Sequence, residues 1–335
     1  MFRKGKFVLI CLILTMLATS CATATQNKKE RDGDIIKSIE FAQPAAAYES
    51  EFKKITEALE NADKDLFSQE LPVYRIVPRK KDKHYDNEVL SVFEMKDCSM
   101  RASSFMVTYE NNSEEVDIFP SGSFSYKNSE KKSYSDDIPI SLSNEEVKKQ
   151  AEEFLLSRNL LPEGFYALEE LGTTKREITE PGADFPSEPI TMEKSPTFVR
   201  RIDGYELLGT SKIIVNFNYN GIIEVTSLYN DYELHKKIKC ISLDEAIQKI
   251  NTSASLYDYD LEKVTGSIDE LKLTNVEIVY YDSSPLNLER NTHIQPCYHF
   301  SGTVSDSKGN VSTFYALVPA LPASETVDNP PLEEY

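Results

Sequence analysis

The chain has little glycine, no tryptophan and a shortage of positive charge. Of its 335 residues, 12 are glycine, 37 are Lys or Arg and 55 are Asp or Glu, so the formal net charge is −18. Proteins that bind nucleic acid neutralise phosphates with an excess of Lys and Arg, so this balance argues against a nucleic-acid partner. Glycine stands at about half of the typical ~7%, which disfavours glycine-rich phosphate loops. The segment Gly204–Ser211 is similar to such a loop, but Thr210 replaces the required Lys, and two turn glycines around a short strand are predicted instead.

The N-terminus has the pattern of an export signal. Three basic residues among the first six precede a nearly uninterrupted apolar run, Phe7–Ala18, which is shorter than the ~20 residues that a membrane-spanning helix needs. The segment Leu17–Cys21 (LATSC) is similar to a bacterial lipobox, in which the cysteine is lipidated. We therefore predict that residues 1–20 are a lipoprotein signal peptide. A lipid on Cys21 would then anchor the protein to the extracytoplasmic face of a cell membrane. An ordinary secretory signal and an uncleaved anchor are the alternatives.

The exported body is predicted to be more acidic than the whole chain. Without residues 1–20 it carries 34 Lys and Arg against 55 Asp and Glu, a net charge of −21. Anionic headgroups should repel such a body, so the lipid alone would hold it at the membrane. Residues 21–40 are mostly polar and aperiodic and are predicted to be a flexible tether. The three cysteines of the body are widely spaced, which favours buried free thiols over one disulfide with an odd thiol: Cys98, Cys240 and Cys297.

An amphipathic helix is predicted at the start of the body. Within residues 45–67, apolar residues recur at intervals of three and four, as they do on one face of a helix. These residues are Phe52, Ile55, Leu59, Ala62 and Leu66.

A pattern of one helix followed by alternating strands then occurs three times, with starts near residues 87, 143 and 242. The predicted domains are 41–135 (the lead-in helix and the first module), 136–235 (the second module) and 236–321 (the third module). Residues 322–335 are acidic and rich in proline, and are predicted to be a disordered tail.

Local signals are clearest in the second and third modules. Ser143 and Glu146 form a predicted capping box, and Ser242 with Glu245 repeats this spacing. Asn220-Gly221 lies between two alternating segments and predicts a hairpin with a type I′ turn. A helix buries one face of an antiparallel sheet when it packs on it. The predicted fold class is therefore α+β, with tandem modules of one helix packed on a three- to four-stranded antiparallel sheet.

Three motifs in these modules resemble PepSY-type modules of Gram-positive envelope proteins. They are the pattern F-x-R-x-I-D-G at Phe198–Gly204, the pattern S-x-x-E-A-I at Ser242–Ile247 and the pattern F-Y-A-x-V-P-A at Phe314–Ala320. The layout is also similar to the extracytoplasmic domains of YycH- and YycI-type regulators of a sensor kinase. The resemblance covers residues 143–321 and, more loosely, 71–128. It implies a non-enzymatic α+β protein that acts by binding in the envelope, although YycH and YycI types are held by a transmembrane helix rather than by a lipid.

Candidate catalytic and metal-binding residues are few. Neither a Gly-x-Ser-x-Gly elbow nor a His-Glu-x-x-His motif occurs. His293, Cys297 and His299 fall on one parity of a predicted strand, and imidazole with thiolate can bind zinc. However, Pro296 interrupts the strand and no fourth ligand is indicated, so a half-buried strand without a metal is expected.

Four tyrosines of the third module are the predicted partner contacts, since tyrosine combines a large contact area with a polar tip: Tyr280, Tyr281, Tyr298 and Tyr315. Packing within the sheet is the alternative role. The sequence thus predicts a non-enzymatic lipoprotein without a cofactor. It would bind a protein or peptide of the envelope by strand addition and modulate a sensor, a protease or a secreted enzyme. The alternative is a small-ligand carrier lipoprotein or an envelope hydrolase, which needs a deep pocket or clustered titratable groups.

Overall fold

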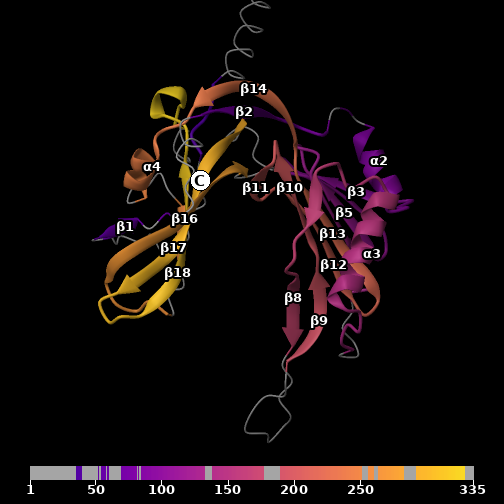
Figure 1. Ribbon diagram of the computed structural model, residues 1–335. Helices are drawn as coiled ribbons and strands as arrows, with labels where there is room; N and C mark the ends of the chain where they lie inside the picture. Colours follow the sequence, from indigo (N-terminus) through magenta and orange to yellow (C-terminus); the bar gives the residue numbers. More distant parts are fainter. Residues whose placement is uncertain are drawn as a thin grey trace, which may run out of the picture. The chain divides into compact units, whose positions relative to one another are not determined.

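The computed structural model describes residues 35–39, 52, 54–57, 59, 69–80, 82, 84–132, 138–176, 189–250, 256–259, 263–282 and 292–328 (Figure 1). They belong to two compact units, one with residues 35–38 and 322–328 and the other with residues 39–321. The predicted signal peptide 1–20, Cys21 and residues 329–335 lie outside the described residues.

Backbone hydrogen bonds define the smaller unit. Ser38 N donates to Val327 O and Val327 N donates to Ile36 O, both at 2.9 Å. The short 3-10 helix η2 (Ala323–Glu325) precedes this contact. Residues 322–328, which the sequence places in a disordered tail, therefore have a defined conformation.

In the larger unit, hydrogen bonds connect the 18 strands of the described residues into one mixed sheet. The predicted fold class of tandem modules, each a helix on its own small sheet, is wrong because strands pair across the predicted module boundaries. β6 (Phe124–Asn128) pairs with β13 (Gly221–Leu228), and β2 (Glu70–Val77) pairs with β14 (Asp231–Lys239). Separate small sheets would leave rows of unpaired N–H and C=O groups at their edges, and this pairing satisfies them.

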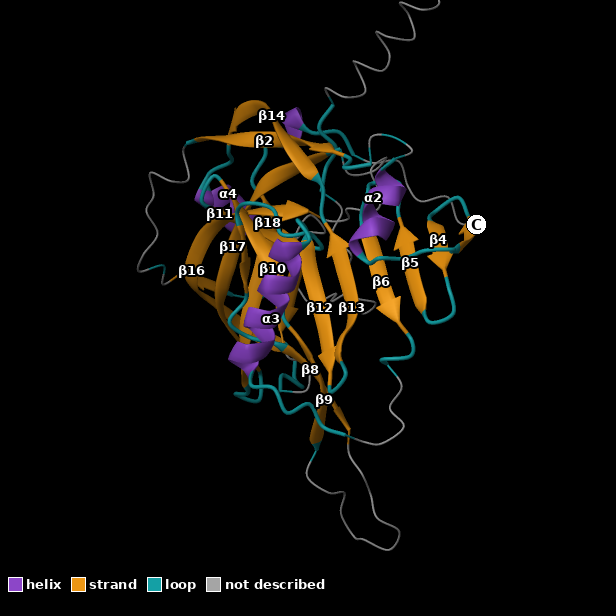
Figure 2. Ribbon diagram, turned by 90° about the vertical axis from the view of Figure 1, so that its right-hand side faces the viewer, coloured by secondary structure: helices purple, strands orange, loops and turns teal. Residues whose placement is uncertain are grey.

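One part of the sheet, here called the two-helix sheet, is antiparallel throughout. Helices α2 (Tyr85–Val92) and α3 (Asn144–Ser157) pack on one of its faces (Figure 2). Its first six strands are, in spatial order, β3 (Ser99–Ala102), β4 (Val107–Glu110), β5 (Glu114–Ile118), β6, β13 and β12 (Lys212–Asn218). Beyond β12 the sheet continues with two strand pairs. β9 (Ile190–Ser195) pairs with β12 and with β8 (Gly172–Arg176), and β10 (Thr197–Ile202) pairs with β12 and with β7 (Phe165–Ala167).

The other part, the one-helix sheet, carries α4 (Leu243–Lys249) on one face. Its strands are, in spatial order, β15 (Leu256–Tyr259), β18 (Val311–Pro319), β17 (His293–Asp306) and β16 (Ile268–Asp282), followed by β1 (Ile55–Glu57) and β11 (Tyr205–Gly209), which both run parallel to β16. In the described part of the chain, no helix is long and apolar enough for a membrane span.

The predicted lead-in helix is wrong where the structure describes it. Residues Ile55–Glu57 form β1 and pair with Leu271–Leu273 of β16. Phe52 is buried against Phe314 with the ring centroids 5.5 Å apart. A neighbouring strand offers backbone hydrogen bonds and a core at the same time, which outweighs a helical spacing of apolar residues.

Of two predicted turns, one forms with a different backbone geometry and the other forms as predicted. The Asn220-Gly221 hairpin forms, but its type I′ turn is wrong, because Gly221 has φ of 92° while Asn220 is not among the residues with positive φ. The Asp203-Gly204 turn between β10 and β11 does have positive φ at both positions, 51° and 86°. The segment that is similar to a phosphate loop is therefore a turn followed by strand β11, as predicted.

Helix α3 begins at the predicted capping box. Ser143 Oγ accepts from Glu146 N at 3.2 Å, and Ser143 N donates to Glu146 Oε2 at 2.8 Å. Val147, Ala151 and Leu155 then lie at helical spacing on one face and are fully buried against the two-helix sheet. The helix and its start are confirmed, because both depend on contacts close in sequence.

Candidate functional site

The structure does not bring the metal candidates together. His293 and Cys297 are buried, and burial raises the pKa of the Cys297 thiol above its ordinary value. The ring of His293 faces His235 at 4.7 Å between centroids, whereas His299 Nδ1 lies 2.8 Å from Glu277 Oε1. Among the described residues, no three His, Cys, Asp or Glu side chains gather as a metal site would require. All three cysteines of the body are free thiols, with Cys240 and Cys297 buried and Cys98 half-buried.

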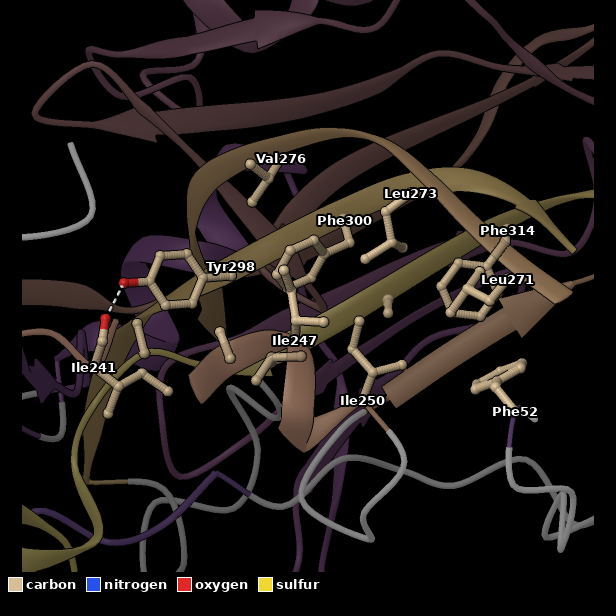
Figure 3. Close-up of a cluster of buried hydrophobic side chains, with 14 of the residues drawn as sticks. Phe52, Ile241, Ile247, Ile250, Leu271, Leu273, Val276, Tyr298, Phe300 and Phe314 are labelled. Atoms are coloured by element: carbon tan, nitrogen blue, oxygen red, sulfur yellow. Dashed lines mark hydrogen bonds between the residues drawn. The ribbon is translucent and has the colours of Figure 1, made fainter. Parts of the chain in front are cut away.

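Three of the four candidate tyrosines are core residues, so the prediction that they contact a partner is wrong. Tyr280 and Tyr298 are fully buried and Tyr281 is nearly so. Tyr298 packs in the core of the one-helix sheet, and its hydroxyl donates to Ile241 O at 2.5 Å (Figure 3). Tyr280 donates to Pro72 O at 2.7 Å. Of the four, Tyr315 alone is open to solvent, with 49% of its surface exposed.

A groove at the β3 end of the two-helix sheet is the candidate site. It has a volume of about 850 Å³. Apolar side chains from three strands and two connections line most of it: Met100, Met106, Val107, Ile118 and Pro120. Polar side chains complete the lining: Lys80, Asp82, Asp86, Ser103 and Tyr109. We call this site the β3 groove.

The β3 groove is the continuation of the sheet face that the helices cover elsewhere. Residues on that face pair directly across the strands, since Met100 is opposite Tyr109 and Val107 is opposite Ile118. α2 has only eight residues, and its Val89 packs in the same core as Val116 and Phe124. Figure 2 shows β4 and β5 continuing the sheet beyond α2. The apolar face therefore extends further than the helix that covers it.

A partly buried ion pair forms part of the polar wall of the groove. Lys80 Nζ lies 2.6 Å from Asp86 Oδ1, and the hydroxyl of Tyr109 donates to Asp86 Oδ2 at 3.0 Å. Burial, together with this hydrogen bond and the charge of Asp86, raises the pKa of Tyr109 to about 12. The three side chains of this wall thus hold one another in place, with Tyr109 keeping its proton at physiological pH.

The turn between β3 and β4 carries an exposed aromatic side chain, Phe105, next in sequence to Met106, which lines the groove. Ser103 Oγ accepts from Phe105 N at 3.2 Å and from Met106 N at 3.1 Å, while Ser103 N donates to Met106 O at 2.9 Å. Phe105 is 79% exposed, and Met100 on β3 is 60% exposed. A hydroxyl that caps its own turn fixes the backbone, so this exposed aromatic ring stands on an ordered support.

Strand β3 is also an edge of the sheet. Within the part of the chain that the structure describes, β4 is the only strand that pairs with it. An edge strand offers unpaired N–H and C=O groups to a further strand. The groove therefore combines an apolar cavity, exposed anchor side chains and a backbone edge.

The sequence pattern did not point to this site. The candidate residues singled out in the sequence lie elsewhere in the chain, whereas this site forms around the turn with Ser103 and Phe105 and the strand that begins at Val107. The available signal is the run of Met100, Phe105 and Met106 among small and polar residues. In a strand with one buried face, apolar and polar residues alternate, and this run does not follow that pattern.

Comparison with known proteins adds no relative. No protein-family profile matches the chain, and no curated protein or solved structure is significantly similar to it. The resemblance to PepSY and YycI modules therefore stays a hypothesis that rests on the three motifs.

Proposed function

We propose that this chain is a non-enzymatic envelope lipoprotein that binds an extended segment of a protein or peptide partner in the β3 groove. The observation that carries the proposal is the coincidence of the free β3 edge with the uncovered apolar face beside it. Peptide recognition by strand addition uses these two features, the edge for main-chain hydrogen bonds and the adjoining pockets for alternate side chains.

The exposed side chains would contribute part of the binding energy of a complex. Burial of a side chain such as Met100 or Phe105 stabilises a complex by roughly 1.5–3 kcal/mol each. Methionine is flexible and polarisable, so Met100 and Met106 can adapt to the shape of a partner's side chain. Aromatic and methionine side chains are also enriched at the centres of protein interfaces.

The membrane anchor belongs to the same proposal. The lipid on Cys21 would keep the binding site at the outer face of the membrane. Replacement of Cys21 by Ala should release the protein from the membrane fraction. A Cys21→Ala variant that stays in the membrane fraction after high-salt washing would contradict anchoring by lipid alone.

The binding proposal is tested by crosslinking in intact cells, followed by mass spectrometry, with two matched variants. Met100→Lys puts a charge on the groove, whereas Leu234→Lys puts one on β14, where Leu234 is 62% exposed. We expect the partner to be lost with Met100→Lys and kept with Leu234→Lys. Equal recovery of the same protein by both variants would overturn the proposal that the β3 groove is the binding site.

A small-ligand carrier is the second candidate, because about 850 Å³ lies within the roughly 300–1,000 Å³ of ligand pockets. Native mass spectrometry of the protein purified from cells separates the two functions. A small molecule that is bound to the native chain and absent from Met100→Lys would favour the carrier.

A further inference from the structure

The hydrogen-bonding pattern of the β3–β4 hairpin determines which groups of β3 face outward. Ser103 N donates to Met106 O, so these residues form a hydrogen-bonded pair. Pairs alternate along an antiparallel ladder, which makes Arg101 with Thr108 the next hydrogen-bonded pair and leaves Met100 and Ala102 in the pairs between. The N–H and C=O groups of Met100 and Ala102 therefore point away from β4, toward the free edge.

The same two residues place their side chains on the groove face. Met100 is opposite Tyr109 and Ala102 is opposite Val107, and both of these partners line the groove. Arg101, between them, lies on the opposite face. Residues of an added strand that bond to Met100 and Ala102 would thus also place their side chains over the groove.

The opposite face carries a network of charged side chains. Glu110 on β4, Glu115 on β5, Lys127 on β6 and Glu224 on β13 lie directly opposite one another in turn, and Arg101 on β3 lies diagonally across from Glu110, which pairs with Ser99. Arg101 Nη2 lies 2.9 Å from Glu110 Oε2 and 4.0 Å from Glu115 Oε2, and Lys127 Nζ lies 3.8 Å from Glu115 Oε1. Arg101, the charged residue of β3, thus places a positive charge at the free edge.

Arg101 retains capacity for another carboxylate. Both of its ion pairs use Nη2, and its side chain is largely exposed. A guanidinium carries five N–H donors in a planar fork, so the donors on Nη1 and Nε can serve a further acceptor. The net charge of −18 is screened beyond roughly 8–10 Å at physiological salt, so the nearest charge decides the preference at this position.

We propose that the β3 groove selects an extended segment with apolar residues at positions i and i+2 and an acidic residue at i+1, added antiparallel to β3. The apolar residues lie opposite Met100 and Ala102, over the groove, and the acidic residue lies opposite Arg101. This inference rests on the proposed function and names the class of partner. An antiparallel arrangement continues the all-antiparallel two-helix sheet and pairs residues directly across the strands.

Blocked, labelled peptides test the selection against the full-length chain in detergent, by fluorescence anisotropy. The first peptide is Thr-Val-Asp-Val-Thr, the second has Lys in place of Asp, and the third is the scrambled Val-Val-Asp-Thr-Thr. We expect the first peptide to bind about fivefold tighter than the second, because opposite charges directly across strands attract and like charges repel. It should also bind tighter than the scrambled peptide. Equal affinity for all three would overturn the selection.

Arg101 variants isolate the charge preference. Arg101→Glu should reverse the order of the Asp and Lys peptides, and Arg101→Gln should make them equal. Both substitutions change an exposed side chain, so folding is expected to persist and is checked by circular dichroism. A preference for the Asp peptide that survives Arg101→Glu would show that the acidic residue does not face Arg101.

Amide exchange measured by NMR reports the register itself. On addition of the first peptide, the amides of Met100 and Ala102 should become protected, while the amide of Arg101, already bonded to β4, should change little. If no peptide binds but the partner crosslinked in cells depends on Met100, the strand register is wrong and the proposed function stands. If Met100→Lys has no effect in cells either, the proposed function also fails.

Discussion

The two ends of one sheet face differ in what covers them. Under α2 and α3, the residues of β5 and β6 on this face are buried, with Phe124 only 1% exposed. Two strands further along, Met100 on the same face is 60% exposed. Apolar side chains occur at both ends, so composition does not distinguish core from groove. The two ends differ in whether a helix covers the sheet face.

Helix length explains where the cover stops. α3 has 14 residues and a complete capping box, whereas α2 has eight residues and no side-chain cap at its N-terminus. After α2 the chain adopts positive φ at Glu94 (58°) and Asp97 (54°) and enters β3. Phe93, just after α2, stacks on Tyr126 of β6, whereas Asp86 in the first turn of α2 bonds to Tyr109 of β4. The N-terminal end of α2 therefore borders the groove, and the chain after α2 leads into β3 without covering it.

The edges of the sheet differ as well. β14 pairs with β2 along its length, and its exposed residues include three lysines, Lys236, Lys237 and Lys239. Lysines on an edge strand discourage the addition of another strand. β3 carries Arg101 alone, beside Ser99, Met100 and Ala102. The edge that adjoins the groove is thus the one less protected against pairing.

The largest expected effect comes from a matched pair of truncations on this face. Phe124→Ala should lower the free energy of unfolding by about 3–5 kcal/mol, because it opens a cavity against Phe93, whereas Met100→Ala should change it by less than about 0.5 kcal/mol. Denaturant unfolding followed by circular dichroism suits a chain without tryptophan. A loss of more than about 2 kcal/mol in Met100→Ala would break the comparison, since Met100 would then be core.

A smaller effect is expected at the start of the longer helix. Ser143→Ala removes the hydroxyl of the capping box and should cost about 1 kcal/mol of stability. The control is Ser91→Ala on α2, whose Oγ donates to Glu88 O on the exposed side of the helix. That control should be close to neutral. Equal losses in both variants would show that the cap does not determine how well α3 covers the sheet.

The end of the shorter helix should respond to glycine. Glu94 holds a left-handed conformation that side chains disfavour, so Glu94→Gly should raise the free energy of unfolding by about 0.5–1 kcal/mol. Asn159, after α3, has the same conformation (φ of 58°), but asparagine tolerates it better. Asn159→Gly should therefore gain less. An equal gain at both positions would contradict this account of the helix ends.

The smallest effect is spectroscopic and concerns the wall of the groove. Burial and the contact with Asp86 raise the pKa of Tyr109 from the ordinary 10.0 to about 12. The stabilising contribution of neutral Tyr109 is then fully present below pH 10 and is lost as the pH rises through 12. In an alkaline absorbance titration, Tyr109→Phe should remove signal near pH 12, about one part in the 18 tyrosines. Removal of signal near pH 10 instead would mean that the groove wall is open to water.

Features within a few residues of one another could be predicted from the sequence. The capping box at Ser143, the helix start at Ser242 and the hairpin at Asn220-Gly221 form where the sequence places them. Their signals are side chains that bond to neighbouring backbone or alternate along a single strand. The fold class and the interface tyrosines failed for the opposite reason, since both depend on residues far apart in the chain.

Composition and local chemistry by themselves determined the acidic character of this protein, the starts of α3 and α4 and the hairpin at Asn220-Gly221. Tertiary structure alone decided that Ile55 enters a strand beside β16, that Tyr280 and Tyr298 become core, and that Met100 stays exposed. The physical reason is that an apolar side chain is buried only where another element packs on it, and its own sequence does not determine where that element lies. An apolar face becomes a core where a helix lies on it, and it becomes a groove where the helix ends.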